Sequence, residues 1–414
     1  MLLAALSGAK LAEACRLPKV AGEICGGIVV GPTILGACFP EVYTYIFLGF
    51  PTEGPVLSVF YWFGLILLMF SSGYEARMDN LRGDAKIISF LAAGATAIPM
   101  LVGFYAAHYY FAAYYIAEGA DETVFCIIVA IATAVTSLPV ISKIFMDLGL
   151  IDHRFAKVIL ATATIQDLFL WIILSIATSI MSQSAVVPSD IALHIFVTIA
   201  IFVVSMVIAP RMNKIPRLEK LAIFSYDSIY FILCFACIFI CSLFGVNIMY
   251  SAFAAGLIFR HIRNDDAVKA HAKLKDVCLA FFTPLYFSIV GLRIFITSDF
   301  SVSRFLFFLV LVSAVELAGC IIAMRIIRLS WLTSFNLGIA MNARGGPGIV
   351  LATVTYEMGI INYEFFCVLI FTTLVTSAVA GWWIDFINKR GKLFSIENDD
   401  DIIHAAYGAR HANV

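Results

Sequence analysis

The sequence predicts an all-α polytopic membrane protein with about 13 transmembrane helices. Of its 414 residues, 62% are hydrophobic and only 13% are charged, whereas a typical soluble domain is nearer a quarter charged. Long apolar stretches recur along the whole chain, and lysine and arginine concentrate in alternate connections between them. Together these observations indicate that lipid is the solvent for most of the protein surface.

Thirteen stretches are apolar enough to cross a bilayer, for which a helix needs ~20 mainly apolar residues. They lie near residues 1–15, 20–38, 56–75, 85–110, 123–146, 155–182, 190–210, 222–243, 246–260, 277–296, 304–327, 332–356 and 363–386. Because the first stretch is short, we expect either a clipped helix or a native chain that begins earlier.

The basic residues predict the orientation of these spans. Twenty-two of the 27 lysines and arginines fall in one alternate set of connections, and only Arg293 and Arg304 fall in the other. Since cytoplasmic loops carry the excess of positive charge, we expect the N-terminus outside and the C-terminus in the cytoplasm. Residues 1–390 then form a membrane transporter domain, and residues 391–414 form a cytoplasmic tail too short for a nucleotide-binding domain.

Other functional classes find little support in the sequence. The ten cysteines lack zinc-ligand spacing with histidines, so we interpret them as small residues that pack between helices. Serine, histidine and aspartate form no credible catalytic arrangement. The sequence therefore predicts neither an enzyme nor a cofactor or nucleic-acid partner.

Four ionisable residues fall within predicted spans: Glu23, Asp167, Glu316 and Arg344. Charged groups are costly in a bilayer, by ~2.5–3.5 kcal/mol on insertion scales, so each is a functional hypothesis. Asp167 lies near the middle of a long span, where a transported ion would be met. Glu23 lies in a glycine-rich span and could instead be a structural carboxylate that a neighbouring helix satisfies.

Two predicted spans contain helix breaks. The stretch "ATAVTSLP" places Pro139 just after the hydroxyls of Thr136 and Ser137, and Asn342–Gly348 has three glycines and a proline. A broken helix is tolerated inside a membrane where its freed backbone groups line a cavity or are buried in protein. Interrupted helices in corresponding halves point to the midplane binding site of a transporter.

The residues around these breaks predict an ion site. Half-helix ends carry about half an elementary charge, which Arg344 can offset at negative ends and a carboxylate at positive ends. Asp167 can hold a small hard cation with hydroxyl and carbonyl oxygens, or it can hold a proton, and this competition would couple the two. The predicted cation and proton site comprises Asp167, Gln166, Thr133, Thr136 and Ser137, and the predicted supporting residues are Arg344, Glu316, Asn342 and Glu23.

Several stretches resemble the monovalent cation:proton antiporter family, in particular its bacterial Kef-like and Nap-like branch with the sodium/hydrogen exchanger domain. They include "LPKVAGEICGGIVVGPTILG", "TSLPVISKIFMDLGL", "ATATIQDLFLW" and "GIAMNARGGPGIVLATV", and the resemblance covers roughly residues 11–390. It implies inverted repeats with two broken crossing helices, a homodimer built from dimerisation and core helices, and a bacterial inner (plasma) membrane location. It also implies that Asp167 is the transport carboxylate.

The chain departs from this family at two positions. Gln166 stands where many members have aspartate or asparagine, and a neutral residue there implies electroneutral exchange, as in potassium-handling members. Glu316 falls where many relatives carry a lysine. Arg344 has two open interpretations: its guanidinium donates to carbonyls at the break, or it forms a salt bridge with Glu23 or Glu316.

The sequence thus predicts a secondary antiporter that exchanges a monovalent cation, Na⁺ or K⁺, for protons. Three alternatives stay open: a channel-like potassium efflux protein on the same scaffold, a carrier of another solute, and a non-transporting membrane subunit or sensor.

Overall fold

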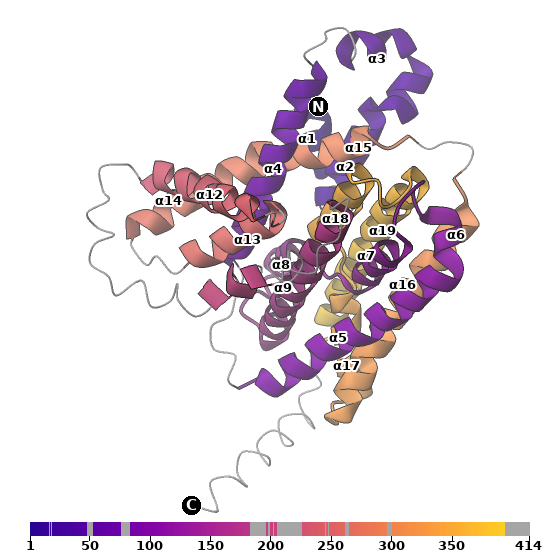
Figure 1. Ribbon diagram of the computed structural model, residues 1–414. Coiled ribbons are helices and arrows are strands. Elements are labelled where there is room, and N and C mark those ends of the chain that lie inside the picture. Colours follow the sequence, from indigo (N-terminus) through magenta and orange to yellow (C-terminus); the bar gives the residue numbers. More distant parts are fainter. Residues whose placement is uncertain are drawn as a thin grey trace, which may run out of the picture. The chain divides into compact units, whose positions relative to one another are not determined.

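The computed structural model describes residues 1–15, 17, 19–47, 53–75, 83–182, 196–197, 199–201, 203–204, 226–244, 246, 248–260, 265–295 and 300–393. Helices make up almost all of its regular structure (Figure 1), and the described residues add one isolated β-bridge, between Ile116 and Ile361. The chain divides into two compact units, of which the first comprises Met1–Ala76, Gly119–Val124 and Leu168–Phe300, and the second Arg77–Glu118, Phe125–Asp167 and Ser301–Val414.

The first unit is built on close helix contacts through small residues. A Cβ on Gly22 would lie only 2.1 Å from the carbonyl oxygen of Gly8, and a Cβ on Gly27 would lie 2.0 Å from that of Ser288. Small residues allow such backbone contact between membrane helices. The helices of this unit are α1 (Leu2–Ala14), α2 (Lys19–Val30), α3 (Pro40–Phe47), α4 (Glu53–Glu75), α12 (Tyr226–Leu243), α13 (Ile248–Phe259), α14 (Asp265–Val277) and α15 (Thr283–Leu292).

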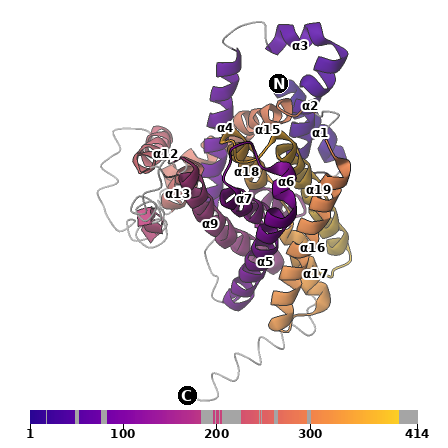
Figure 2. The ribbon, with the colours of Figure 1, turned by 45° about the vertical axis from the view of Figure 1, so that its right-hand side comes forward.

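The second unit contains both predicted breaks. Its helices are α5 (Ala85–Ala106), α6 (Ala112–Tyr115), most of α7 (Glu122–Ala134), α8 (Leu138–Asp147), α9 (Arg154–Ser182) as far as Asp167, α16 (Val302–Ile326), α17 (Trp331–Met341), α18 (Gly346–Glu357) and α19 (Tyr363–Lys389). Helices α5 and α16 run side by side (Figure 2). They touch through glycine, because a Cβ on Gly319 would lie 2.4 Å from the carbonyl oxygen of Gly94.

The helices confirm the predicted all-α membrane fold. Among the described residues, seven helical stretches are long and apolar enough to cross a membrane, and shorter apolar helices accompany them. The spans predicted at 123–146 and 332–356 are each divided into two helices, as the break motifs predicted. Most of the predicted span 190–210, and the tail beyond residue 393, lie outside the described residues.

Among the described residues, helices α3, α6 and α14 lie outside the predicted spans. Helix α3 occupies a connection between predicted spans, and α14 extends the helix that precedes α15 by way of the π-helical turn Cys278–Phe282. Helix α14 contains Lys269, Lys273 and Lys275, so the hydropathy pattern assigned it to a connection. Charge density argues against a membrane span, but it does not argue against a helix.

Candidate functional site

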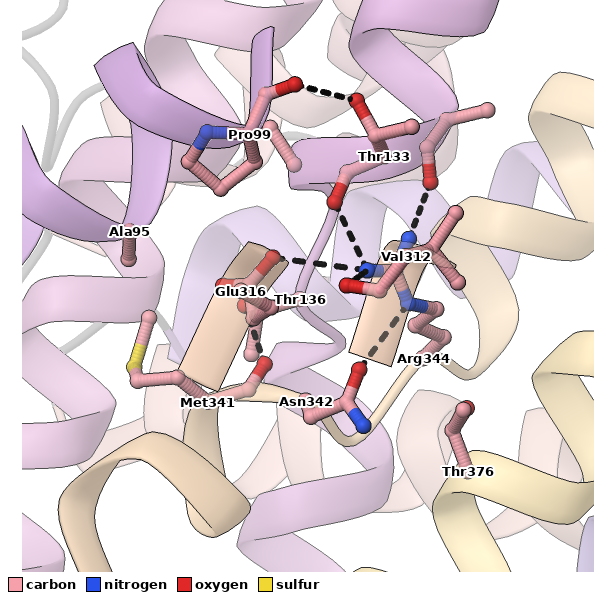
Figure 3. Close-up of polar contacts among 12 residues, drawn as sticks. Ala95, Pro99, Thr133, Thr136, Val312, Glu316, Met341, Asn342, Arg344 and Thr376 are labelled. Atoms are coloured by element: carbon pink, nitrogen blue, oxygen red, sulfur yellow. Dashed lines mark hydrogen bonds and ion pairs between the residues drawn. The ribbon is translucent and has the colours of Figure 1, made fainter. Parts of the chain in front are cut away.

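The two interrupted spans of the second unit cross at their breaks. The backbone N–H of Ser137 donates to the carbonyl of Ala343 at 2.7 Å. The hydroxyl of Thr136 donates to the carbonyl of Met341 at 2.5 Å, as Figure 3 shows. Each break therefore supplies hydrogen-bond partners to the other, and the prediction of two broken crossing helices is confirmed.

Local sequence explains why the chain breaks and crosses here. Ser137 caps α8, its hydroxyl oxygen accepting from the N–H of Val140 at 3.3 Å, and a proline follows in the first turn of each half-helix after a break. Proline is favoured there because the first N–H groups of a helix have no intrahelical partner. A Cβ on Gly345 would lie 2.4 Å from the Ser137 hydroxyl oxygen, so this approach requires glycine.

Arg344 lies at the centre of the crossing and is only 2% exposed. Its Nη1 donates to the carbonyl of Ala132 and its Nη2 to that of Thr133, the latter at 2.7 Å. Its Nε donates to Oδ1 of Asn342 at 3.2 Å. The two carbonyls belong to the C-terminal end of α7, which carries negative partial charge, so the guanidinium stabilises the end that the first break exposes.

Arg344 also forms a fully buried ion pair. Its Nη2 lies 3.4 Å from Oε2 of Glu316 on α16 (Figure 3), and Glu316 has no exposed surface. Of the two acidic partners that the sequence left open, Glu316 forms the ion pair with Arg344 within the second unit, whereas Glu23 belongs to the first unit. The carbonyl contacts and the ion pair therefore coexist.

Gln166 ties α9 to the same helix end. Its Nε2 donates to the carbonyls of Ala95 on α5, at 3.0 Å, and of Ala134, the last residue of α7, at 2.5 Å. The amide thus fixes the register of α9 against the crossing, one residue before Asp167.

Asp167 is 2% exposed, and its Oδ1 has no hydrogen-bond partner among the described residues. Buried polar groups are normally hydrogen-bonded, and each exception needs an explanation. The carboxylate lies inside the protein on a helix that Gln166 anchors to the crossing. It therefore retains an oxygen that can take a proton or a cation.

The three predicted hydroxyl residues all make backbone contacts. The Thr133 hydroxyl donates to the carbonyls of Pro99, at 2.8 Å, and Ala130, at 2.7 Å, and the Thr136 and Ser137 hydroxyls bond across and within the breaks. A hydroxyl that donates its proton keeps acceptor lone pairs on oxygen, so Thr133 and Thr136 can still accept or coordinate. The structure brings these residues, Gln166, Glu316, Asn342 and Arg344 into one unit.

Sequence reasoning missed a row of buried hydroxyls on α19. The hydroxyl of Ser377 donates to the carbonyl oxygen of Arg344, and that of Thr376 donates within α19, to the carbonyl of Thr372 at 2.8 Å. Thr372 and Thr373 lie one helical turn before Thr376 and Ser377 on α19, and all four are buried. Their helical spacing within a predicted span was the sequence signal that could have identified them.

The chain is similar to known transmembrane exchangers over most of its length. A family model described as "Sodium/hydrogen exchanger, transmembrane" matches residues 1–390. The chain is 26% identical over 386 residues to "Cation/H(+) antiporter 17" of Arabidopsis thaliana, covering 91% of this chain and 46% of that protein. It is 27% identical over 383 residues to "K(+)/H(+) antiporter 1" of Saccharomyces cerevisiae, covering 88% and 43%.

The coverage differs between relatives. The chain spans less than half the length of those plant and yeast proteins. By contrast, it is 22% identical over 376 residues to "Na(+)/H(+) antiporter NhaS4" of Synechocystis sp., covering 87% of this chain and 89% of that protein. Among solved structures, the sodium proton antiporter MjNhaP1 of Methanocaldococcus jannaschii matches with a TM-score of 0.65, 13% identity and coverage of 93% and 95%. At that identity, the likeness shows the fold alone.

Proposed function

Because the chain belongs to the sodium/hydrogen exchanger family, we propose that it is a secondary active antiporter that exchanges a monovalent cation for protons by alternating access. The family is one of transmembrane exchangers rather than enzymes. The printed names of relatives support Na⁺ and K⁺ as the candidate cations, because one is a K⁺/H⁺ antiporter and another a Na⁺/H⁺ antiporter.

One observation supports this proposal most strongly: Asp167 is a buried carboxylate whose Oδ1 has no hydrogen-bond partner among the described residues, and it directly follows Gln166, whose amide donates to the carbonyl at the end of α7. Burial disfavours a charged carboxylate that lacks a partner, and either a proton or a cation relieves that cost. One carboxylate cannot bind a proton and a cation tightly at the same time. Release of a proton therefore accompanies binding of a cation, which is the coupling that an antiporter requires.

The surrounding residues would position Asp167 and complete the coordination of the cation. Gln166 positions Asp167 through its two backbone contacts. Hydroxyl oxygens of Thr133, Thr136 and Ser137 are candidates to complete the coordination of a hard cation together with backbone carbonyls.

The charged neighbours would keep the crossing intact. Arg344, Glu316 and Asn342 form a connected buried group at the end of α7. Because Arg344 and Glu316 neutralise each other, Asp167 is left as the one unpaired ionisable group of the proposed site, which supports electroneutral exchange. Glu23, on α2 of the first unit, is proposed as a structural carboxylate.

We further propose that residues 1–390 form the transporter domain, with dimerisation and core helices interleaved in a homodimer, and that residues 391–414 form a cytoplasmic tail. The distribution of lysine and arginine supports an N-terminus outside the cell. A bacterial inner membrane is supported by the nearly full-length match to the Na⁺/H⁺ antiporter of the bacterium Synechocystis.

Purified protein in liposomes with an internal pH dye tests the proposal. Li⁺, Na⁺, K⁺ and Rb⁺ are added outside in turn, with choline as the impermeant control and protein-free liposomes as the background. We expect at least one cation to make the lumen more alkaline, because inward cation movement drives protons out. Cation uptake without proton movement would instead support the channel interpretation, and no response to any cation would contradict an antiporter.

A further inference from the structure

A small cavity lies beside Arg344 in the second unit. It offers about 10 Å³ of space for a water-sized sphere, and all of its walls are buried. Its walls come from α7, α16, α18, α19 and the second break, and include Ala132, Phe308, Arg344, Gly348, Thr372 and Thr373. A space of this order accommodates a water molecule where polar groups line it.

Thr372 provides the first polar group. Its side chain is 1% exposed, and its hydroxyl has no hydrogen-bond partner among the described residues, although it lines the cavity. The other threonines of this region differ, since Thr376 donates to carbonyls of its own helix and Thr355 does the same on α18. A buried hydroxyl without a partner is costly, so a ligand that bonds to it would stabilise the fold.

Arg344 also lines the cavity, and its Nη1 keeps a second N–H after the bond to the Ala132 carbonyl, so Arg344 provides the second polar group and restricts the ligand. A guanidinium carries five N–H donors and no acceptor, so the ligand must accept a hydrogen bond from it. Its positive charge disfavours a cation, and Glu316 already neutralises that charge at 3.4 Å, which leaves an added anion without a counter-charge. Water accepts from Arg344 and can donate to the Thr372 hydroxyl at the same time.

We propose that this cavity is a water-binding site in which one ordered water bridges the Arg344 guanidinium and the Thr372 hydroxyl. The site joins α19 to the arginine a second time, in addition to the bond from Ser377 to the Arg344 carbonyl. Gly348 keeps the space open, because a Cβ at this position would lie 2.9 Å from Thr373 Oγ1 and 3.9 Å from Arg344 Cβ. This role is independent of which ion the protein transports.

A high-resolution cryo-electron microscopy map of the full chain in nanodiscs tests the proposal. In the unaltered protein we expect density within hydrogen-bonding distance of both Arg344 and Thr372. Thr372→Val keeps the side-chain volume but removes the hydroxyl, so the density should be lost, and Thr372→Ser should retain it. Thr355→Val is the matched control, because that hydroxyl bonds within α18, and it should leave the density unchanged.

Thermal melting gives a second readout, in which Thr372→Val should lower the melting temperature and Thr372→Ser should recover most of the loss. If Thr372→Val does not yield folded protein, Gly348→Ala serves instead, because its methyl group would occupy the space and displace the water. The proposal is overturned if the unaltered protein lacks this density in a map that resolves other buried waters. It is equally overturned if the density persists in both Thr372→Val and Gly348→Ala.

Discussion

Helices α9 and α19 each follow an interrupted span, and both contact the crossing, yet their polar residues differ. Helix α9 reaches the end of α7 through the amide of Gln166 and carries Asp167 at the next position. Helix α19 reaches the second break through the hydroxyl of Ser377 and carries threonines in the surrounding turns. Both sets are buried, but only α9 brings a group that can change charge.

This difference suggests that α9 and α19 have different roles at the crossing. A threonine or serine hydroxyl does not ionise in the physiological range, so α19 can hold Arg344 without altering its charge state. A carboxylate alternates between a neutral and a charged form, and a proton or a cation decides which form is stable. We infer that α9 carries the exchange chemistry and that α19 gives the crossing a fixed support.

Removing the titratable group of α9 should have the largest effect. Asp167→Asn keeps the side-chain volume but cannot release a proton, so we expect cation-driven proton movement in liposomes to fall to the protein-free background. The matched change on α19, Thr376→Val, removes a hydroxyl that bonds within its own helix and should leave exchange largely intact. Equal loss in both variants would remove the distinction between the helices.

Arg344 contacts both the end of α7 and Ser377 of α19. Its substitutions should have the next largest effect. Arg344→Ala leaves a buried Glu316 without its counter-charge, and losing one partner of a buried ion pair costs about 3–5 kcal/mol. We therefore expect a strongly lowered melting temperature. Arg344→Lys keeps the charge but loses the planar set of donors that contacts two carbonyls, so transport should be impaired while the fold largely persists.

Arg304→Lys is a suitable control for that substitution. Arg304 lies on α16, where its Nη2 is 2.9 Å from both carboxylate oxygens of Glu364 on α19, so it too is an arginine paired with a carboxylate. We expect this variant to transport normally. A full transport rate in Arg344→Lys would mean that charge alone matters at the crossing and that donor geometry does not.

Glu316→Gln should have a smaller effect, because Arg344 keeps its carbonyl acceptors. Losing a hydrogen bond to a charged group costs about 1.5–3 kcal/mol, so the melting temperature in detergent should fall while the pH optimum of exchange stays unchanged. A moved optimum with unchanged melting would indicate instead that Glu316 shares a proton with Asp167, since coupled acids titrate as a pair.

Membrane potential should have the smallest effect of all. If Asp167 is the only group that exchanges a proton for a cation, one positive charge moves each way and no net charge crosses. The rate of exchange driven by Na⁺ should then be the same with and without a potential set by valinomycin and potassium. A rate that follows the potential would show that a second group carries a further proton.

Much of this architecture could be predicted from the sequence, because its signals are local. Apolar stretches and basic connections predicted the helical membrane fold, and proline and glycine near Ser137 and Gly345 predicted the breaks. Helix α14 was missed because hydropathy detects membrane spans, and this helix is rich in lysine. The span predicted at 190–210 lies largely outside the described residues.

The partners of the buried polar groups could not be predicted, since they depend on contacts between segments distant in sequence. Arg344 contacts carbonyls more than two hundred positions earlier, and backbone carbonyls carry no sequence signature. The sequence also could not separate Glu23 from Glu316 as its acidic partner. Hydroxyl residues are common in membrane helices. The role of the hydroxyls on α19 therefore became evident only from the contact between Ser377 and Arg344 in the structure.

The central claim is that a cation and a proton compete for Asp167, and proton release on cation binding tests it most directly. Purified protein in weakly buffered detergent solution is titrated separately with Na⁺, K⁺ and Li⁺, while a pH indicator counts the protons released and calorimetry counts the cations bound. For a cation that binds, we predict one proton released per cation, and neither binding nor release in Asp167→Asn. Cation binding without proton release, or release that persists in Asp167→Asn, would contradict the account.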